Sequence, residues 1–138
     1  MASTVPFKLI TPTQVVYDGR AELVIAVTTE GEEGILPKHA PFLAALRPGV
    51  LRANVAADGK TGRLELATGE GFVQALPDRV TVLVDDALRF EDVDVARTRE
   101  ELAAATERQK AQPIDSPAFA REQAAIDFAN AKLRLTGH

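Results

Sequence analysis

Apolar and polar residues alternate with a period of two over most of the stretch from Phe7 to Val84. Successive side chains of a β-strand point to opposite faces of its sheet, so this alternation predicts strands that each bury one face. Turn-forming residues interrupt the pattern about every eight to twelve residues, a spacing typical of a β-sandwich or barrel. A helix, whose apolar residues recur with a period of about 3.6, does not fit this part of the chain.

Two hairpins can be placed within the alternating stretch. In the first, Asp58-Gly59 lies between two alternating runs, and this dipeptide favours a two-residue hairpin turn. In the second, a strand over residues 72–76 is followed by a turn at Pro77-Asp78 and then by three valines at even positions. We expect these valines to share one buried face. They are Val80, Val82 and Val84.

The composition changes near Asp92, beyond which β-branched residues become fewer and alanine becomes frequent. Because alanine has the highest helix propensity, the sequence predicts a helix that is capped by Asp92 and runs to about Lys110. Ser116 followed by Pro117 is a strong start signal for a second helix, which we expect to end near Leu135. The connection between the helices is short, and it predicts an antiparallel helical hairpin.

The predicted architecture is a mainly β N-terminal sandwich followed by a C-terminal antiparallel two-helix hairpin, an α+β chain in two parts. We place the β-sandwich domain at residues 1–88 and the helical hairpin domain at residues 89–138. The charge supports this division, because residues 1–92 hold nine basic and thirteen acidic side chains, while residues 93–138 hold seven of each. All of the excess negative charge therefore belongs to the sandwich part.

The charge and the composition argue against several classes of protein. With a net charge of −4 and a pI of about 5.2, the chain lacks the basic stripe that is typical of nucleic-acid binding. It has no cysteine, which excludes disulfides, thiolate catalysis and cysteine-bound zinc. Its longest aliphatic run, residues 23–27, is far shorter than the roughly twenty residues that cross a bilayer, and residues 1–4 do not resemble a secretion signal. We expect no direct bilayer insertion, and membrane association only through a protein partner.

No group of side chains predicts a catalytic or metal site. His39 and His138 are far apart in the sequence, so neither a metal-ligand spacing nor a nucleophile–base pair can be argued. Adjacent acids such as Glu32-Glu33 point apart in a strand and are more often solvated than paired for acid–base chemistry. Gly59-Lys60-Thr61 resembles the end of a phosphate-binding loop, but Asn54 stands where such a loop needs glycine. We therefore expect no catalytic residues, no metal and no cofactor.

Residues 31–41 carry the densest turn chemistry of the chain, GEEGILPKHAP. Its two glycines permit positive φ angles, while its two prolines fix φ and favour extended backbone in the residues before them. We interpret the segment as a shaped loop, too short for a helix or a strand, with its polar groups directed outward. From its chemistry alone it is a surface connection, in which His39 is solvated or hydrogen-bonded to a nearby carbonyl.

The same segment resembles the signature of the epsilon subunit of the rotary F-type ATP synthase. The match includes Gly31-Glu32-x-Gly34-Ile35-Leu36-Pro37-x-His39-Ala40-Pro41 and the later Arg47-Pro48-Gly49. Order and spacing both agree, and the similarity extends from Phe7-x-Leu9-Ile10-Thr11-Pro12 to the last helix. A β-sandwich followed by an alanine-rich helical hairpin is also the architecture of this family.

The resemblance implies a non-catalytic, regulatory subunit of the central stalk, which is part of the rotor. In this family the sandwich is held against the gamma subunit and the proteolipid ring, peripherally, at the cytoplasmic face of the energy-transducing membrane. There it transmits torque and couples proton transport to ATP synthesis by the catalytic core of the F-type complex. An alternative is a free-standing β-sandwich module that binds a sugar or a peptide. The chain has no Trp and one Tyr, so surfaces on which a sugar could stack are scarce.

By this resemblance, three residues of the 31–41 segment match positions at the contact with the proteolipid ring and the gamma subunit. They are Glu32, Lys38 and His39. Lys38 departs from the family, in which its position is often glycine. Glu70 is a second departure, because a glycine pair is usual at this point of the run Thr68-Gly69-Glu70-Gly71-Phe72.

The helical hairpin of this family lies folded beside the sandwich or extends along gamma towards the beta subunit, where it slows ATP hydrolysis. Alanine-rich faces bury little apolar area, so two dockings can differ by only on the order of a few kcal/mol. The resemblance gives six basic candidates for the contact with beta: Arg97, Arg99, Arg108, Arg121, Lys132 and Arg134. Each of them can equally be a solvated residue of a helix face.

Relatives that bind ATP carry an Ile/Leu-Asp-x-x-Arg-Ala motif at the start of the first hairpin helix. The matching run here is Val93-Asp94-Val95-Ala96-Arg97-Thr98, so the acid and the arginine remain while threonine replaces alanine. The later arginines of that site align with Ala104, Phe128 and Lys132, which leaves at most one further cation.

A vestigial nucleotide site of Asp94, Arg97 and Lys132 is therefore expected, and it binds ATP weakly or not at all, since each lost charge-assisted contact costs about 1.5 to 3 kcal/mol. A gap in the alignment near Gln112 would instead bring Arg121 or Arg134 into the missing positions.

Overall fold

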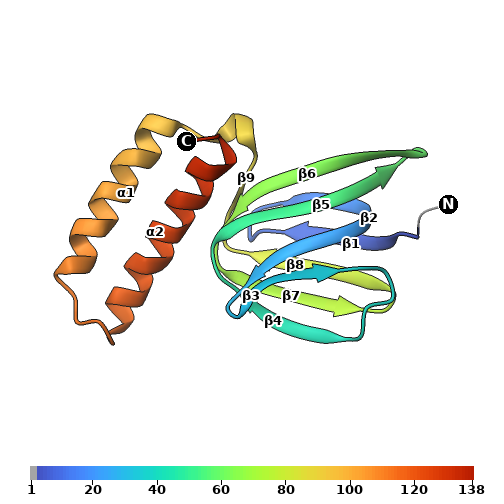
Figure 1. Ribbon diagram of the computed structural model, residues 1–138, viewed down its shortest axis with the longest axis horizontal. Coiled ribbons are helices and arrows are strands. Elements are labelled where there is room, and N and C mark those ends of the chain that lie inside the picture. Colours follow the sequence, from blue (N-terminus) through green and yellow to red (C-terminus); the bar gives the residue numbers. More distant parts are fainter. Residues whose placement is uncertain (1–2) are drawn as a thin grey trace.

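The computed structural model describes residues 3–138 and places nine strands before two helices in that range (Figure 1). The predicted fold class, a mainly β sandwich followed by an antiparallel helical hairpin, is confirmed. The strands are β1 (Val5–Ile10), β2 (Val15–Thr28), β3 (Gly31–Ile35), β4 (Phe42–Leu46), β5 (Gly49–Ala57), β6 (Lys60–Thr68), β7 (Gly71–Leu76), β8 (Arg79–Val84) and β9 (Ala87–Leu88). A short 3-10 helix, η1 (Phe90–Asp92), leads to α1 (Val95–Lys110) and α2 (Pro117–Leu135).

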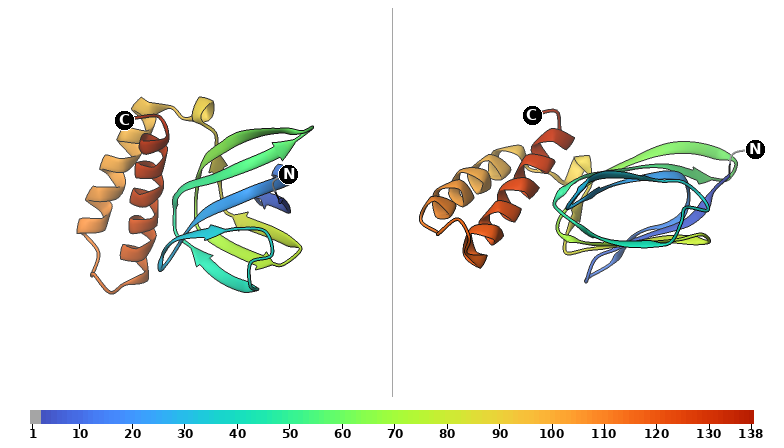
Figure 2. Two further views of the ribbon diagram at one scale, coloured as in Figure 1. Left: turned by 45° about the vertical axis from the view of Figure 1, so that its right-hand side comes forward. Right: turned by 60° about the horizontal axis from the view of Figure 1, so that its bottom comes forward.

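The strands form one sheet that folds over on itself. Neighbouring strands follow the order β1-β8-β7-β4-β2-β5-β6-β9, and β3 pairs with β2 outside this path. β1 runs parallel to β8 and antiparallel to β2, so it joins two parts of the sheet. Viewed from the end, in the right-hand picture of Figure 2, the strands form a flattened ring whose two layers enclose the core.

Both predicted hairpins are confirmed. β5 and β6 pair as far as Ala57 and Lys60, and Asp58 (φ 52°) and Gly59 (φ 75°) form the turn between them. Positive φ at both central residues is the mark of a type I′ turn, whose twist matches that of the paired strands. β7 and β8 pair on either side of the second predicted turn, at residues 77–78.

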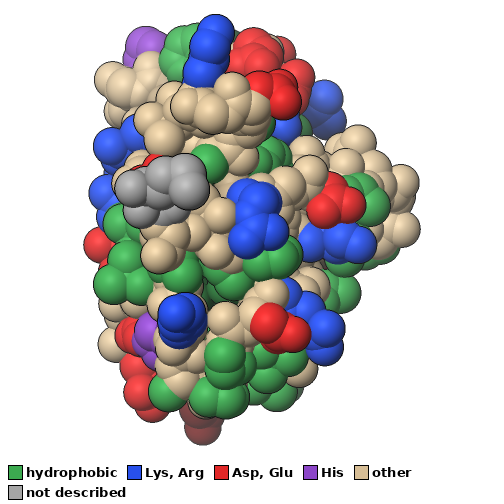
Figure 3. Space-filling view, turned by 90° about the vertical axis from the view of Figure 1, so that its right-hand side faces the viewer, with side chains coloured by type: hydrophobic (Ala, Val, Ile, Leu, Met, Phe, Trp, Pro, Cys, Tyr) green, Lys and Arg blue, Asp and Glu red, His purple; other side chains and the backbone are tan. Residues whose placement is uncertain are grey.

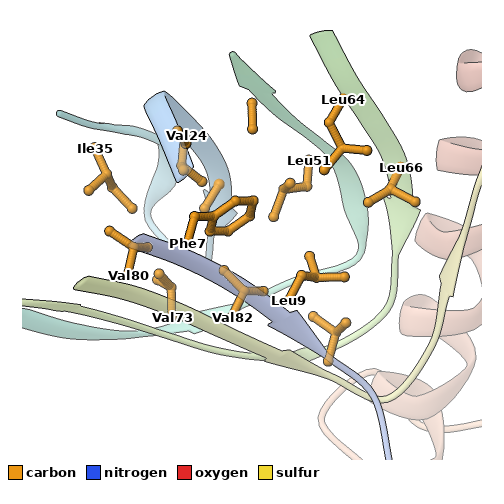
Figure 4. Packing of buried hydrophobic residues seen from close by; sticks show 14 of the residues in the cluster. Phe7, Leu9, Val24, Ile35, Leu51, Leu64, Leu66, Val73, Val80 and Val82 are labelled. Atoms are coloured by element: carbon orange, nitrogen blue, oxygen red, sulfur yellow. The ribbon is translucent and has the colours of Figure 1, made fainter. Parts of the chain in front are cut away.

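The hydrophobic core lies between the two layers (Figure 4). Phe7 and Leu9 enter it from β1, while β5 and β6 contribute Leu51 and Leu66. Burying a side chain of this size stabilises the fold by about 1.5 to 3 kcal/mol. The three even-numbered valines of β8 that were expected to share a buried face are 1%, 0% and 4% exposed. They are Val80, Val82 and Val84.

Helix α1 begins later than predicted. Its N-cap is Asp94, where the backbone is extended and Oδ1 accepts a hydrogen bond from the backbone N–H of Arg97 (3.1 Å). Asp92 lies inside η1, and its own N–H donates to the carbonyl of Arg89 (3.0 Å). The prediction that Asp92 caps the helix was wrong, because this residue is already part of a separate turn. The predicted end at Lys110 is confirmed.

Helix α2 begins where the sequence predicts. Ser116 Oγ accepts a hydrogen bond from the N–H of Phe119 (3.1 Å), and Pro117 occupies the first turn, where an N–H has no helical partner. The helix ends at Leu135, also as predicted. α1 and α2 lie side by side and antiparallel in Figures 1 and 2.

The hairpin docks on the sandwich mainly through α2. Val50 of β5, Ala67 of β6 and Ala131 of α2 form a small buried cluster, against which Phe128 and Leu135 pack. α1 lies on the far side of α2 from the strands (Figure 1). Within residues 3–138, no hydrogen bond or salt bridge connects either long helix to a strand. The docking contact is therefore small and apolar.

The change from strands to helices coincides with the predicted boundary between residues 1–88 and 89–138. The last strand ends at Leu88. Arg89 then anchors the linker to the sandwich, because its Nη2 donates a hydrogen bond to the carbonyl of Val16 (3.2 Å). That the two parts fold separately stays a prediction.

Candidate functional site

The segment 31–41 begins as a strand. Gly31 (φ 122°) follows a tight turn in which Thr28 Oγ1 donates to the carbonyl of Gly31 (2.7 Å), and β3 then pairs antiparallel with β2 up to Ile35. The interpretation as a loop without regular structure was therefore wrong for Gly31–Ile35. Strand propensity is low in this glycine-containing run, but pairing with the long β2 overrides it.

The second half of the segment is the shaped loop that was expected. The N–H of His39 donates to the carbonyl of Leu36 (3.1 Å), which closes a turn around Pro37 and Lys38. Lys38 takes the left-handed conformation (φ 65°), which glycine adopts without strain and other residues rarely adopt. This explains in physical terms why a glycine suits the position.

Glu32 and His39 do not lie together. Ile35 points into the core, so the alternation along β3 directs Glu33 to the same side and Glu32 to the outer face. On that face Glu32 Oε2 lies 2.7 Å from Nη2 of Arg52 in β5. Glu32 thus lies on the outer face of β3, while His39, in the turn after the strand, lies against Glu33 of the opposite face.

His39 lies in a small cluster with Glu33 and Phe42. Its Nδ1 is 2.8 Å from the carbonyl of Ala40, and since a carbonyl only accepts, Nδ1 carries the donated proton. Its Nε2 is 3.5 Å from Oε1 of Glu33, and its ring packs edge-on against Phe42, with 5.0 Å between the centroids. Sequence reasoning missed Glu33, although its position two residues before the buried Ile35 could have identified it.

An exposed apolar patch was also missed. Leu43 of β4, Phe72 of β7 and Leu83 of β8 are 69%, 55% and 50% exposed, and they lie on the outer face of three adjacent strands. Phe72 is paired directly with Leu83. Patches of this kind mark partner surfaces on soluble domains. Figure 3, which views the opposite end of the sandwich from the helices, shows hydrophobic side chains between scattered charged ones.

A cleft of about 400 Å³ lies between the two long helices. A smaller cavity of about 160 Å³ continues it towards the start of α1, and both are lined by Arg97, Glu101 and Lys132. Asp94 lines the smaller cavity. The three residues of the predicted vestigial site, Asp94, Arg97 and Lys132, therefore surround one connected region.

Most charges in the cleft are already engaged. Lys132 is 8% exposed, its Nζ lies 3.2 Å from Oε1 of Glu101, and it sits 4.7 Å above the ring of Phe128. Asp94 uses its carboxylate to cap α1. Among residues 3–138, the guanidinium of Arg97 takes part in no salt bridge or hydrogen bond. The cleft thus offers one uncommitted cation, beside the carboxylates of Glu100 and Glu101.

The six basic candidates for a contact with beta do not share one surface. Arg108 and Lys132 bind carboxylates across the hairpin. Arg134 is also exposed, but it lies beside the sandwich, where it lines two cavities. The other three are exposed on the helices, and one of them approaches the C-terminus, with 3.3 Å from its Nη2 to Nδ1 of His138. These three are Arg97, Arg99 and Arg121, and the one whose Nη2 lies near His138 is Arg99.

No helix in the described part of the chain has the length and apolarity that a bilayer crossing needs. The model of the family "ATP synthase, Delta/Epsilon chain, beta-sandwich domain" matches residues 4–90. The ATP synthase epsilon chain of Chromobacterium violaceum is 37% identical over 127 residues, 92% of this chain and 89% of that relative. The chain belongs to the ATP synthase epsilon chain family. The epsilon chain of Syntrophobacter fumaroxidans is 36% identical over 135 residues, covering 98% and 97% of the two chains.

Solved structures share the fold of this epsilon-family chain at low identity. A chain of the Euglena gracilis mitochondrial ATP synthase, in an assembly of OSCP, F1 and c-ring, superposes with a TM-score of 0.76 at 20% identity, covering 98% of this chain and 82% of that one. A chain of the Tetrahymena thermophila mitochondrial ATP synthase, in a central stalk and c-ring assembly, gives 0.63 at 20% identity, with 97% of each chain covered.

Family membership confirms the resemblance read from the sequence. Epsilon chains are stalk subunits and not catalytic ones, so the prediction of a non-catalytic subunit is also confirmed. The alternative of a free-standing ligand-binding module is wrong, since the match extends through sandwich and hairpin alike. The predicted roles of individual residues stay predictions.

Proposed function

We propose that this chain is the epsilon subunit of a rotary F-type ATP synthase, where it couples proton flow through the proteolipid ring to ATP synthesis and restrains ATP hydrolysis. The observation that carries this proposal is the family match over the sandwich together with relatives that align through the hairpin. The position that fits this role is peripheral, in the central stalk at the cytoplasmic face of the energy-transducing membrane.

The gamma subunit is assigned to the exposed apolar patch of Leu43, Phe72 and Leu83. A rotor subunit that transmits torque needs a stable contact with its neighbour. Burial of apolar surface stabilises such a contact by about 25 cal/mol per Å². The three side chains project from the outer face of paired strands, so their spacing is fixed by the sheet. This support comes in addition to the family match.

The proteolipid ring is assigned to the polar segment that includes Glu32, Lys38 and His39. Loop side chains at the end of a rigid sandwich contribute more to contacts than to the core. Lys38 and His39 belong to the turn after β3, and Glu32 lies on the neighbouring outer face. A ring contact that uses both faces of β3 would wrap around this edge of the sandwich.

The hairpin is proposed as the brake on ATP hydrolysis through a contact with the beta subunit. Its docking on the sandwich is small and apolar, and within residues 3–138 no hydrogen bond or salt bridge holds it there. Such a contact can be exchanged for another of similar free energy. Arg97, Arg99, Arg121 and Arg134 are all exposed in the docked hairpin, and Arg134 also lines two cavities beside the sandwich.

ATP binding to the hairpin is proposed to be weak or absent. A triphosphate needs several charge-assisted contacts. Lys132 is bound to Glu101, and among residues 3–138 the cleft keeps only the guanidinium of Arg97 uncommitted. Isothermal titration of the chain with ATP tests this point. We expect no saturable heat at tens of micromolar ATP, and a saturable signal that Arg97→Ala abolishes would contradict it.

Reconstitution tests the proposed function as a whole. The alpha, beta and gamma subunits and the membrane sector are assembled with and without this chain, and proton-driven ATP synthesis and ATP hydrolysis are measured. We expect synthesis to require the chain and hydrolysis to be faster without it. Equal synthesis in both assemblies would contradict the coupling role, and equal hydrolysis would contradict the brake.

A further inference from the structure

The outer face of β2, β3, β5 and β6 carries both a residue that we assign to the proteolipid ring and the end of α2. Glu32 and Arg52 form an ion pair on this face, with 2.7 Å between Oε2 and Nη2. Beside them lies a cavity of about 290 Å³, whose lining from the hairpin is Arg134 and Leu135. The inference below rests on the proposed function, because it uses Glu32 as a ring contact.

The charged lining of this cavity is balanced without the hairpin. The strands supply two cations and two carboxylates, which pair with each other. These pairs are Arg52 with Glu32, at 2.7 Å, and Arg63 with Glu65, at 3.5 Å between Nε and Oε1. Arg134 adds a third cation from α2, and within residues 3–138 it forms no salt bridge of its own. Docking therefore adds one positive charge to the lining of the cavity beside Glu32.

A carboxylate in a partner contact pairs with a basic group of that partner. A neighbouring cation repels this basic group as it approaches. At the separations across a cavity of this size, in partly screened surroundings, one added charge changes an affinity by about two- to fivefold. The apolar contact of α2 with Val50 and Ala67 is small. A coupling of this size is therefore sufficient to shift how often α2 is docked.

We propose that Arg134 links hairpin docking to attachment at Glu32. In the docked hairpin the charge of Arg134 opposes the approach of a basic group of the ring loops to the carboxylate of Glu32. Attachment at Glu32 in turn favours release of α2 by the same factor, since coupling between two equilibria is reciprocal. Glu32 thereby couples attachment to the ring with docking of the hairpin.

The test measures the affinity of the full-length chain for an assembly of gamma and the proteolipid ring that lacks it. Arg134→Gln is expected to tighten binding about two- to fivefold at low salt and to have no effect at about 0.5 M salt. Arg121→Gln is the matched control, because Arg121 is an exposed arginine of the same helix that does not line the cavity, and the assembly of gamma and ring contains no beta subunit for it to contact. In a Glu32→Gln background, the effect of Arg134→Gln is expected to disappear.

The outcomes separate this inference from the proposed function. Unchanged or weaker binding of Arg134→Gln, or an equal gain in the Glu32→Gln background, overturns the link. A gain that also occurs in Arg134→Lys, which keeps the charge, overturns it as well, because α2 would then be released by lost packing. Methyl NMR signals of Val50 and Ala67, which lie under α2, report docking in each variant. If Glu32→Gln alone binds as tightly as the wild type, the assignment of Glu32 to the ring fails instead.

Discussion

Arg108 of α1 and Glu122 of α2 join the two helices through a salt bridge, with 2.7 Å between Nε and Oε2. The hydrogen bond from Arg108 holds the pKa of the Glu122 carboxyl below its ordinary value of 4.5, and the same contact raises the pKa of Arg108. Because the pKa of Glu122 is lower in the folded chain, the pair stabilises the hairpin above the unfolded pKa. This stabilisation is lost as the pH falls through the folded pKa.

The first prediction concerns this pH dependence. Glu122→Gln is expected to lower the Tm slightly at pH 7, and the difference from the wild type is expected to shrink as the pH falls through the lowered pKa of Glu122 and the wild-type carboxylate is protonated. Thermal unfolding followed by circular dichroism measures it. Glu107→Gln is the control, since Glu107 pairs only with Lys110 of its own helix. A difference that does not shrink on acidification would mean that Glu122 acts through packing and not through its charge.

The second prediction concerns Gly71, at the start of β7. A Cβ there would run into the backbone carbonyl of Leu83 on the paired strand, whereas a Cβ at Gly62 would have as its nearest neighbour Val55 at 4.0 Å. Gly71→Ala is therefore expected to lower the free energy of unfolding by about 2 kcal/mol or more, and Gly62→Ala to change it by less than about 0.5 kcal/mol. Urea unfolding measures both, and equal effects would show that β7 and β8 can move apart.

How much of the fold the sequence predicts depends on how local the deciding interaction is. The even valines of β8 and the Asp58-Gly59 turn are specified by period and dipeptide, so both predictions are confirmed. β3 was missed because a run with two glycines becomes a strand only by pairing with β2, which is a tertiary interaction. Asp92 and Asp94 are equivalent caps locally, and only η1 decides between them.

The candidate site shows the same limit. The exposed patch combines residues from three strands, and only the strand register brings Leu43, Phe72 and Leu83 to one face. Glu32 and His39 are seven positions apart, yet the alternation of β3 separates them. Resemblance, and not pattern, grouped the residues of the interhelical cleft. Their shared cavities could not be foreseen from spacing, because two helices and a turn lie between them.

The third prediction uses the left-handed backbone of Lys38 (φ 65°). Lys38→Gly is expected to leave the free energy of unfolding unchanged or to raise it by up to about 1 kcal/mol, because relief of strain is partly offset by the greater freedom of the unfolded chain. Lys38→Val is expected to lower it by about 1 to 2 kcal/mol, since a β-branched residue resists this conformation. Lys8→Val, at an exposed position of β1, is the control. Equal stability of the glycine and valine variants in urea unfolding would mean that the turn relaxes.

The last prediction separates docking of the hairpin from folding of the sandwich. Ala131 is 1% exposed and packs on Val50 and Ala67, so the larger side chain of Ala131→Leu has no room between α2 and the strands. Overpacking of this kind costs about 1 to 3 kcal/mol, which is comparable to what so small an apolar contact contributes. We expect α2 to leave the strands while the sandwich keeps its urea midpoint, because its core lies between its own layers. Ala120→Leu, at an exposed position of the same helix, should change neither property.

The methyl NMR signals of Val50 and Ala67 report the docking directly. If they keep their wild-type positions in Ala131→Leu, the contact tolerates extra volume and is not the weak point of the hairpin. If the sandwich unfolds together with the loss of docking, the division at residue 88 does not separate two units.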